Sequence, residues 1–216
     1  MAFFSRTFGP VSRHCLTEIV PGLPTVKVRV IEPTASRRCV TLFTDGMSAV
    51  PMKTTKTDTG YELAELFIEL PPDWPYRKLS NAEFNWPIRW LRWASRFPHQ
   101  NAQSLGGPVL FVDVNEAVAI APNRRFSAML LLAETSFMRS DGRTIHLYRL
   151  FPLYPEEVAL SQNKDIAVLF RAFDAKGVKF VIDMDRVSAA PPGCDSSRLI
   201  DASDRHRPAD GKLACS

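Results

Sequence analysis

The chain has 216 residues, of which 45% are hydrophobic and 23% are charged, with a formal net charge of +4. That composition is typical of one globular domain with enough apolar residues for a core. It gives no sign of a membrane span, a secretory signal or a disulfide framework: the longest apolar run covers only residues 128–133, and none of the four cysteines is spaced as C-x-x-C. We therefore expect a cytoplasmic protein with reduced thiols.

The first half of the chain predicts strands. Residues 1–38 form an N-terminal segment that we expect to be partly ordered and packed on the domain, and within it residues 26–31 alternate apolar and basic side chains as a strand does. A second strand over residues 39–44 should end at the turn dipeptide Asp45-Gly46. Residues 61–70 predict a third strand, because their apolar side chains alternate with Glu65 and Glu69.

A helix is predicted next, over roughly residues 86–97. Asn85 is placed to cap it, Pro87 suits its first turn, and Pro98 should prevent its continuation. At about 100° per residue, one narrow stripe contains the bulky aromatic side chains, and a separate strip contains the basic ones. The aromatic set is Trp86, Trp90, Trp93 and Phe97, and the basic set is Arg89, Arg92 and Arg96. We expect the aromatic stripe to be buried and the arginines to face water.

The second half predicts a hairpin followed by helices. Residues 128–137 and 144–151 read as two strands joined through Ser140-Asp141-Gly142. A helix should start near Pro155, a second helical pattern over residues 166–173 should stop at Gly177, and residues 178–182 should form a last strand. We expect an α+β fold with a mainly antiparallel or mixed sheet packed with helices, and a disordered tail over residues 188–216.

The sequence contains no recognisable catalytic, metal-binding or cofactor-binding motif. The common phosphate-binding, zinc-protease and serine-hydrolase motifs do not occur, and the four histidines are scattered. Asp183 and Asp185 are more typical of a turn than of a cation site, and Cys15 beside His14 does not by itself make an activated thiol. The sequence therefore predicts no catalytic residue, no metal and no cofactor.

The order of several short motifs resembles the suppressor of fused family over roughly residues 39–187. The motifs lie at residues 41–48, 51–52, 62–63, 70–75, 86–88, 96–99, 121–123, 141–143, 150–157 and 181–183, followed by Arg186. The resemblance implies an α/β domain without known catalysis. Animal members sequester a transcription factor by holding its peptide between two domains, and bacterial members have been proposed as immunity proteins that neutralise toxins.

This chain is similar to the bacterial, single-domain form, so the two-domain peptide cleft is not carried over. It also departs from bacterial relatives, which have a Gly-x-Gly-His-like turn after the central helix where this chain has Leu105-Gly-Gly-Pro108. The resemblance places candidate partner-binding residues in two groups. They are Phe97, His99, Gly106, Gly107 and Pro108 in the first group, and Tyr154, Glu156 and Glu157 in the second.

The leading hypothesis is a non-catalytic domain that binds another protein, such as a cognate toxin, with no membrane and no nucleic-acid partner. Alternatives are a regulatory module that sequesters another protein, an enzyme that uses Glu156, Glu157 and His99, and a nucleic-acid binder that uses the three arginines of the helix. Strand addition at an exposed sheet edge is a further possible binding mode.

Overall fold

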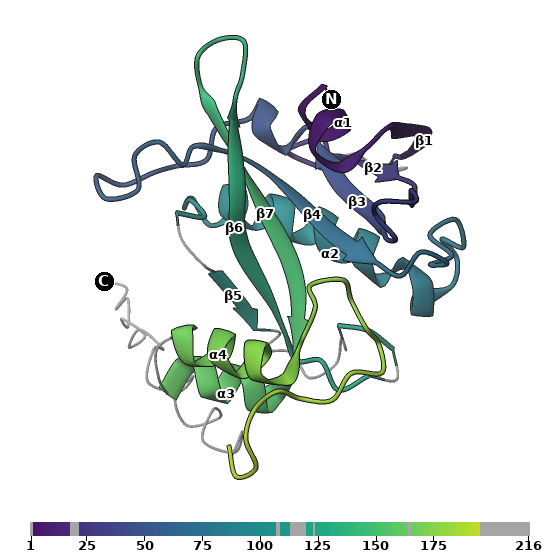
Figure 1. Cartoon of the computed structure of the whole chain (residues 1–216). Helices are drawn as coiled ribbons and strands as arrows, with labels where there is room; N and C mark the ends of the chain where they lie inside the picture. Colours follow the sequence, from purple (N-terminus) through teal and green to yellow (C-terminus); the bar gives the residue numbers. More distant parts are fainter. Residues whose placement is uncertain are drawn as a thin grey trace, which may run out of the picture. The chain divides into compact units, whose positions relative to one another are not determined.

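A seven-stranded mixed sheet dominates the computed structural model (Figure 1), which describes residues 2–17, 22–106, 109–112, 120–122, 124–163 and 166–194. The strand order is β1-β2-β3-β4-β7-β6-β5. The chain divides into two compact units, of which the first comprises residues 1–153 and 179–186 and contains the whole sheet. The predicted α+β class is confirmed. No helix in the described ranges is long and apolar enough to span a bilayer.

The N-terminal half of the sheet is antiparallel throughout. Helix α1 (Ala2–Phe8) precedes β1 (Val11–Leu16), β2 (Lys27–Ile31), β3 (Val40–Asp45) and β4 (Leu63–Leu70). Gly46 ends β3 with a φ of 124°, and a Cβ there would lie 2.6 Å from the Thr25 carbonyl oxygen, so the predicted Asp45-Gly46 turn requires glycine. A short 3-10 helix (Met47–Ala49) follows.

The other half of the sheet is built from β5 (Val109–Val112), β6 (Ala128–Met138) and β7 (Thr144–Leu153), again antiparallel. The predicted hairpin through residues 140–142 is confirmed. The two halves meet where β4 and β7 run parallel, with Leu63 opposite Ile145 and Phe67 opposite Arg149. Helix α2 (Ala82–Gln100) lies in the long connection between these two strands, as a parallel pairing requires.

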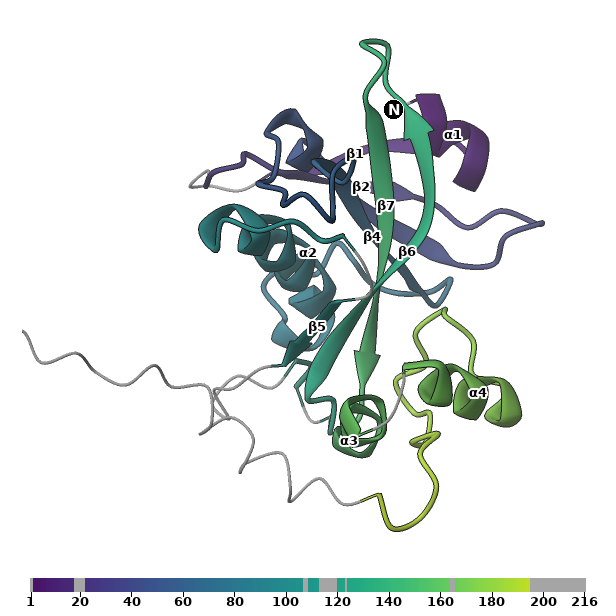
Figure 2. The ribbon, with the colours of Figure 1, turned by 90° about the vertical axis from the view of Figure 1, so that its left-hand side faces the viewer.

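Both faces of the sheet are covered by helices within this unit. Helix α1 and helix α2 lie on opposite sides of it (Figure 2). The ring of Phe4 from α1 stacks on Phe43 at a centroid distance of 3.8 Å and belongs to a buried cluster with Ile31, Phe67 and Leu147. Helix α2 contacts β2, β3 and β4. All eight residues of β4 are consequently buried, including the two glutamates.

Glu69 lies at the centre of a buried ionic network. Arg37 and Arg149 both donate to its carboxylate, and Arg149 also pairs with Glu134. Burial alone would raise the pKa of Glu69, but the two guanidinium groups outweigh it and hold the pKa below its ordinary value. The network joins β4, β6 and β7 to the segment before β3.

Glu65, four residues earlier on the same strand, is satisfied without any cation. Its carboxylate accepts hydrogen bonds from the Thr44 hydroxyl, the backbone N–H groups of Gly46 and Ser48, and the Ser48 hydroxyl. Burial raises the pKa of Glu65, although these hydrogen bonds oppose the shift. The side chain thereby fixes the turn that follows β3.

The second unit comprises residues 154–178 and the chain from residue 187 onward. It contains α3 (Pro155–Asn163) and α4 (Ile166–Lys176), so the predicted helix start at Pro155 and the stop at Gly177 are confirmed. The Val178 N–H donates to the Phe173 carbonyl, which closes the end of α4. A disordered tail was expected over residues 188–216, and residues 195–216 of it lie outside the described residues.

The last predicted strand, residues 178–182, is wrong. Only one isolated bridge forms there, between Val181 and Glu69, and the Ile182 N–H donates to the Glu69 carbonyl. Val178 is already engaged by the end of α4, so too few residues remain to extend a ladder. The proposed division of residues 1–187 at residue 38 stays a prediction, although β1 and β2 pair within the same sheet as β3.

Candidate functional site

Helix α2 is longer than its sequence pattern indicated, and its predicted ends are wrong. Asn81, not Asn85, caps it by accepting a hydrogen bond from the Glu83 N–H at 2.8 Å. Pro87 lies beyond the first turn, and Pro98 lies inside the last turn, which continues to Gln100. Pro98 has no backbone N–H and so cannot donate to the Ala94 carbonyl, but the helix continues past it. The Asn101 N–H then donates to the Phe97 carbonyl and closes the end.

The buried face of α2 is also centred differently. Its middle is a line of four side chains spaced at helical intervals, Pro87, Leu91, Ala94 and Pro98. Trp86 and Trp90 are buried, as expected. Trp93 is 44% exposed, so its predicted burial is wrong. It lies four positions after Arg89, about 40° away around the helix, and it therefore faces the basic strip.

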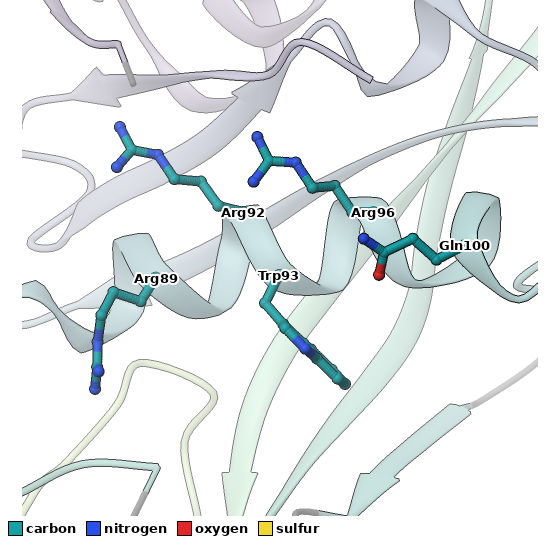
Figure 3. A pocket seen from close by; sticks show the side chains of 5 residues that line it. All are labelled: Arg89, Arg92, Trp93, Arg96 and Gln100. Carbon is teal, nitrogen blue, oxygen red and sulfur yellow. The ribbon is translucent and has the colours of Figure 1, made fainter. Parts of the chain in front are cut away.

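A hollow of about 360 Å³ lies along this exposed side of α2. It is lined by Arg89, Arg92, Trp93, Arg96 and Gln100 (Figure 3). Arg89 and Trp93 extend from one side of the helix, and Arg92 and Arg96 extend from the other. Arg89 and Gln100 are exposed, and the two remaining arginines are partly buried.

The partly buried arginines are positioned by the end of β1 and the segment that follows it. An Nη2 atom of Arg92 donates to the Leu16 carbonyl at 2.9 Å. The guanidinium group of Arg96 lies so close to Gly22 that a Cβ on that residue would come within 2.5 Å of it. Because glycine carries no side chain, the Arg96 head group can occupy this space.

The indole of Trp93 is also held in place. Its ring meets Trp90 in an edge-to-face arrangement at a centroid distance of 5.0 Å, and it lies 5.3 Å from the ring of Phe97. Trp90 is buried and Phe97 is partly buried, so the exposed indole rests on a fixed support. The surface it offers is apolar and rigid.

Three of the five residues that line the hollow are arginines. Helix α2 contains one carboxylate, Glu83 in its first turn, and no aspartate or glutamate occurs from Phe84 to Val112. Arginine stays protonated at all ordinary pH values and has no nucleophilic atom. This arrangement can bind carboxylate or phosphate groups next to a planar apolar side chain, and it offers no acid, base or nucleophile for catalysis.

Two of the predicted binding residues lie at the end of α2. Phe97 is partly buried and supports Trp93, so it borders the hollow. His99 is partly buried, and within the described residues its Nε2 atom has no hydrogen-bond partner. Burial lowers the pKa of His99, which favours the neutral imidazole.

The predicted glycine-rich turn is only partly described. Gly106 packs against Asp58, since a Cβ would lie 3.0 Å from the Cβ of that residue, and its N–H donates to the Ser104 hydroxyl at 3.4 Å. Gly107 and Pro108 lie outside the described residues.

Tyr154, Glu156 and Glu157 belong to the second unit. Glu157 is fully buried, and its two carboxylate oxygens accept the backbone N–H groups of Tyr154 and Ala189 at 2.9 and 2.8 Å. Its geometry is that of a structural carboxylate at a helix start. Tyr154 is 9% exposed, and Glu156 is partly buried. The structure therefore does not bring these residues together with the α2 hollow in one unit.

Sequence reasoning identified the arginines of the hollow but assigned Trp93 to the core and overlooked Gln100. The centre of the buried line could have been found from Pro87, Leu91 and Ala94, which are apolar and spaced as one face. No group of three or more His, Cys, Asp or Glu side chains in the described ranges is arranged to bind a metal ion.

The family model described as Suppressor of fused protein (SUFU) matches residues 22–187. A crystal structure of a SUFU homolog from Neisseria gonorrhoeae FA 1090 is similar with a TM-score of 0.55 and 13% identity, over 89% of this chain and 95% of that one. A comparison with curated proteins found no match.

Two further solved structures share the fold. The structure of the Sufu–Fu complex has a TM-score of 0.62 and 12% identity, over 98% of this chain and 95% of that chain. Drosophila Suppressor of Fused has a TM-score of 0.55 and 13% identity, over 83% of this chain but only 46% of its own length. At such identities, these likenesses concern the fold alone.

Proposed function

The chain belongs to the suppressor of fused family, and we propose that it is a protein-binding domain without catalytic activity of its own. The observation that carries the proposal is the hollow on α2, where a rigid exposed tryptophan lies among arginines. Tryptophan and arginine are the side chains most enriched at the energetic centres of protein interfaces.

Two further observations support a binding function. One of the solved structures with this fold is described as a complex of Sufu with Fu, which gives a precedent for protein binding by the fold. The buried carboxylates in the described part of the chain are committed to structure: Glu65 and Glu157 to backbone N–H groups, and Glu69 to arginines. None of these carboxylates is left available for acid–base chemistry.

The sharper form of the proposal is an immunity-type protein, which neutralises a toxin by covering part of its surface. It would need no catalytic group, only a tight one-to-one complex. A regulatory module that sequesters another partner would use the same surface chemistry, and the identity of the bound protein separates the two.

The test is affinity capture from the native organism with the tagged full chain, followed by mass spectrometry and by reconstitution with the purified partner. We expect one stoichiometric partner. Arg171→Glu, on the exposed side of α4, is the matched charge control for changes in the hollow. If a reconstituted partner is toxic, co-expression of this chain should restore growth. Recovery of no specific partner under any growth condition would contradict the protein-binding function.

A further inference from the structure

Several of the described arginines, Arg89 among them, form no ion pair with a described carboxylate, whereas others do. These pairs include Arg29 with Asp45, Arg37 and Arg149 with Glu69, Arg77 with Glu32, Arg124 with Asp185, and Arg139 and Arg143 with Asp141. Arg89 is exposed, and within the described residues it forms no ion pair. Its planar guanidinium group can bind a carboxylate by donating two parallel hydrogen bonds to it.

The indole of Trp93 lies beside it. Both side chains leave the same side of α2, and both line the hollow (Figure 3). Trp90 and Phe97 already fix the indole. When a ligand packs on it, the Trp93 side chain therefore loses little conformational entropy. An apolar side chain on Trp93 and a carboxylate on Arg89 can therefore be bound at the same time.

The chemistry favours a peptide over a nucleic acid. Single strands are held by several aromatic platforms on which successive bases stack. On α2 only Trp93 is exposed among the tryptophans, because Trp86 and Trp90 are 0% and 8% exposed. One platform next to cationic groups fits one aromatic or aliphatic side chain flanked by acidic residues.

From this arrangement we propose that the α2 hollow binds an acidic segment of a partner protein, with an aromatic side chain seated on Trp93 and a carboxylate on Arg89. This inference rests on the proposed protein-binding function and names the chemistry of the partner. Gln100, also exposed in the hollow, supplies an amide that can bond to the backbone of such a segment.

The experiment uses a fluorescently labelled short peptide that alternates glutamate with phenylalanine, and the full-length protein. Fluorescence anisotropy should show binding that weakens as salt is added. Arg89→Glu and Trp93→Ala should each weaken it by about tenfold or more. Arg171→Glu makes the same charge change on another exposed helix and should leave the affinity within about twofold. Circular dichroism would verify that every variant is folded.

Three outcomes would overturn the inference. The first is equal binding of a peptide with lysine in place of glutamate, and the second is unchanged affinity in both hollow variants. The third is tighter binding of an oligothymidine than of the acidic peptide, lost in Arg89→Glu, which would assign the hollow to nucleic acid.

The two proposals fail separately. If a captured natural partner binds the hollow variants as well as the wild type, the protein-binding function stands and the assignment to this hollow is wrong. If the natural partner binds the wild type and Arg171→Glu but not the hollow variants, the protein-binding function and its assignment to the α2 hollow are both supported.

Discussion

Two sets of arginines in this domain have opposite surroundings. Arg149 is buried and Arg37 is partly buried, and both share the carboxylate of Glu69. Arg89, in contrast, lies on the surface of α2 within a stretch that contains no acidic residue. The comparison teaches that interior charge is neutralised by the fold itself, while the charge of Arg89 is presented outward. Changes in the first set should therefore affect stability, and changes in the second should affect binding.

The largest expected effect comes from Glu69→Gln. It leaves the buried Arg149 and the partly buried Arg37 without their shared carboxylate, and breaking a buried ion pair typically costs about 3–5 kcal/mol. Urea unfolding followed by circular dichroism would measure the loss of the free energy of unfolding.

Glu65→Gln is the matched control, since it makes the same change on the same strand. The amide oxygen can keep the N–H donors of Gly46 and Ser48, and the amide nitrogen can donate to the Thr44 hydroxyl. The expected loss is about 1 kcal/mol or less. If both variants lost the same free energy of unfolding, the ion pairs of Glu69 with the arginines would add nothing beyond what hydrogen bonds provide to Glu65.

A smaller effect is the dependence of stability on pH, which should have opposite signs for the two glutamates. The pKa of Glu69 is held below its ordinary value of 4.5, so its contribution is full above that pH and is lost as the pH falls further. The pKa of Glu65 is raised above 4.5, so its contribution is full below that pH and is lost as the pH rises through the raised pKa.

Unfolding curves from about pH 3 to pH 7 would resolve this difference. Relative to wild type, Glu65→Gln should gain stability as the pH rises above 4.5. Glu69→Gln should lose less stability than wild type does as the pH falls below 4.5. Parallel pH profiles for the two variants would contradict the assignment.

Asn81→Ala tests the start of the helix that carries the hollow. Loss of the cap to the Glu83 N–H should cost about 1 kcal/mol. Urea unfolding would measure this loss. Asn85, which the sequence suggested as the cap, lies inside the helix, and its side-chain amide donates to the Leu79 carbonyl instead. An unchanged free energy of unfolding in Asn81→Ala would contradict the observed helix start.

The smallest expected change in stability is that of Arg89→Glu. The side chain is exposed, so the free energy of unfolding should stay within about 0.5 kcal/mol of the wild type. Thermal and urea unfolding beside Arg171→Glu would measure it. A loss like that of Glu69→Gln would show that Arg89 is structural and remove the contrast between the two sets.

Local patterns predicted the strands and the hairpin, because the alternation of apolar and polar side chains and the turn residues can be recognised within a few consecutive residues. Glu65 and Glu69 could be placed on one face in this way, but their partners could not: Arg149 lies 80 positions from Glu69 and carries no local signal. Trp93 was misplaced because four aromatic residues suggested the wrong centre for the buried face of α2. Pro98 was read as a stop, but the helix continues through it to Gln100.

The parallel pairing of β4 with β7 has a consequence for how the chain folds. Each antiparallel half of the sheet can form from contacts close in sequence, but this seam joins residues 63–67 to residues 145–149 and must wait for the closure of a long loop. Arg149 and Glu69 lie at that seam, so their ion pair forms only when the halves dock. We therefore expect Glu69→Gln to accelerate unfolding more than Glu65→Gln does, and a chain divided at the exposed residues 101–103 to reassemble only while this ion pair is intact.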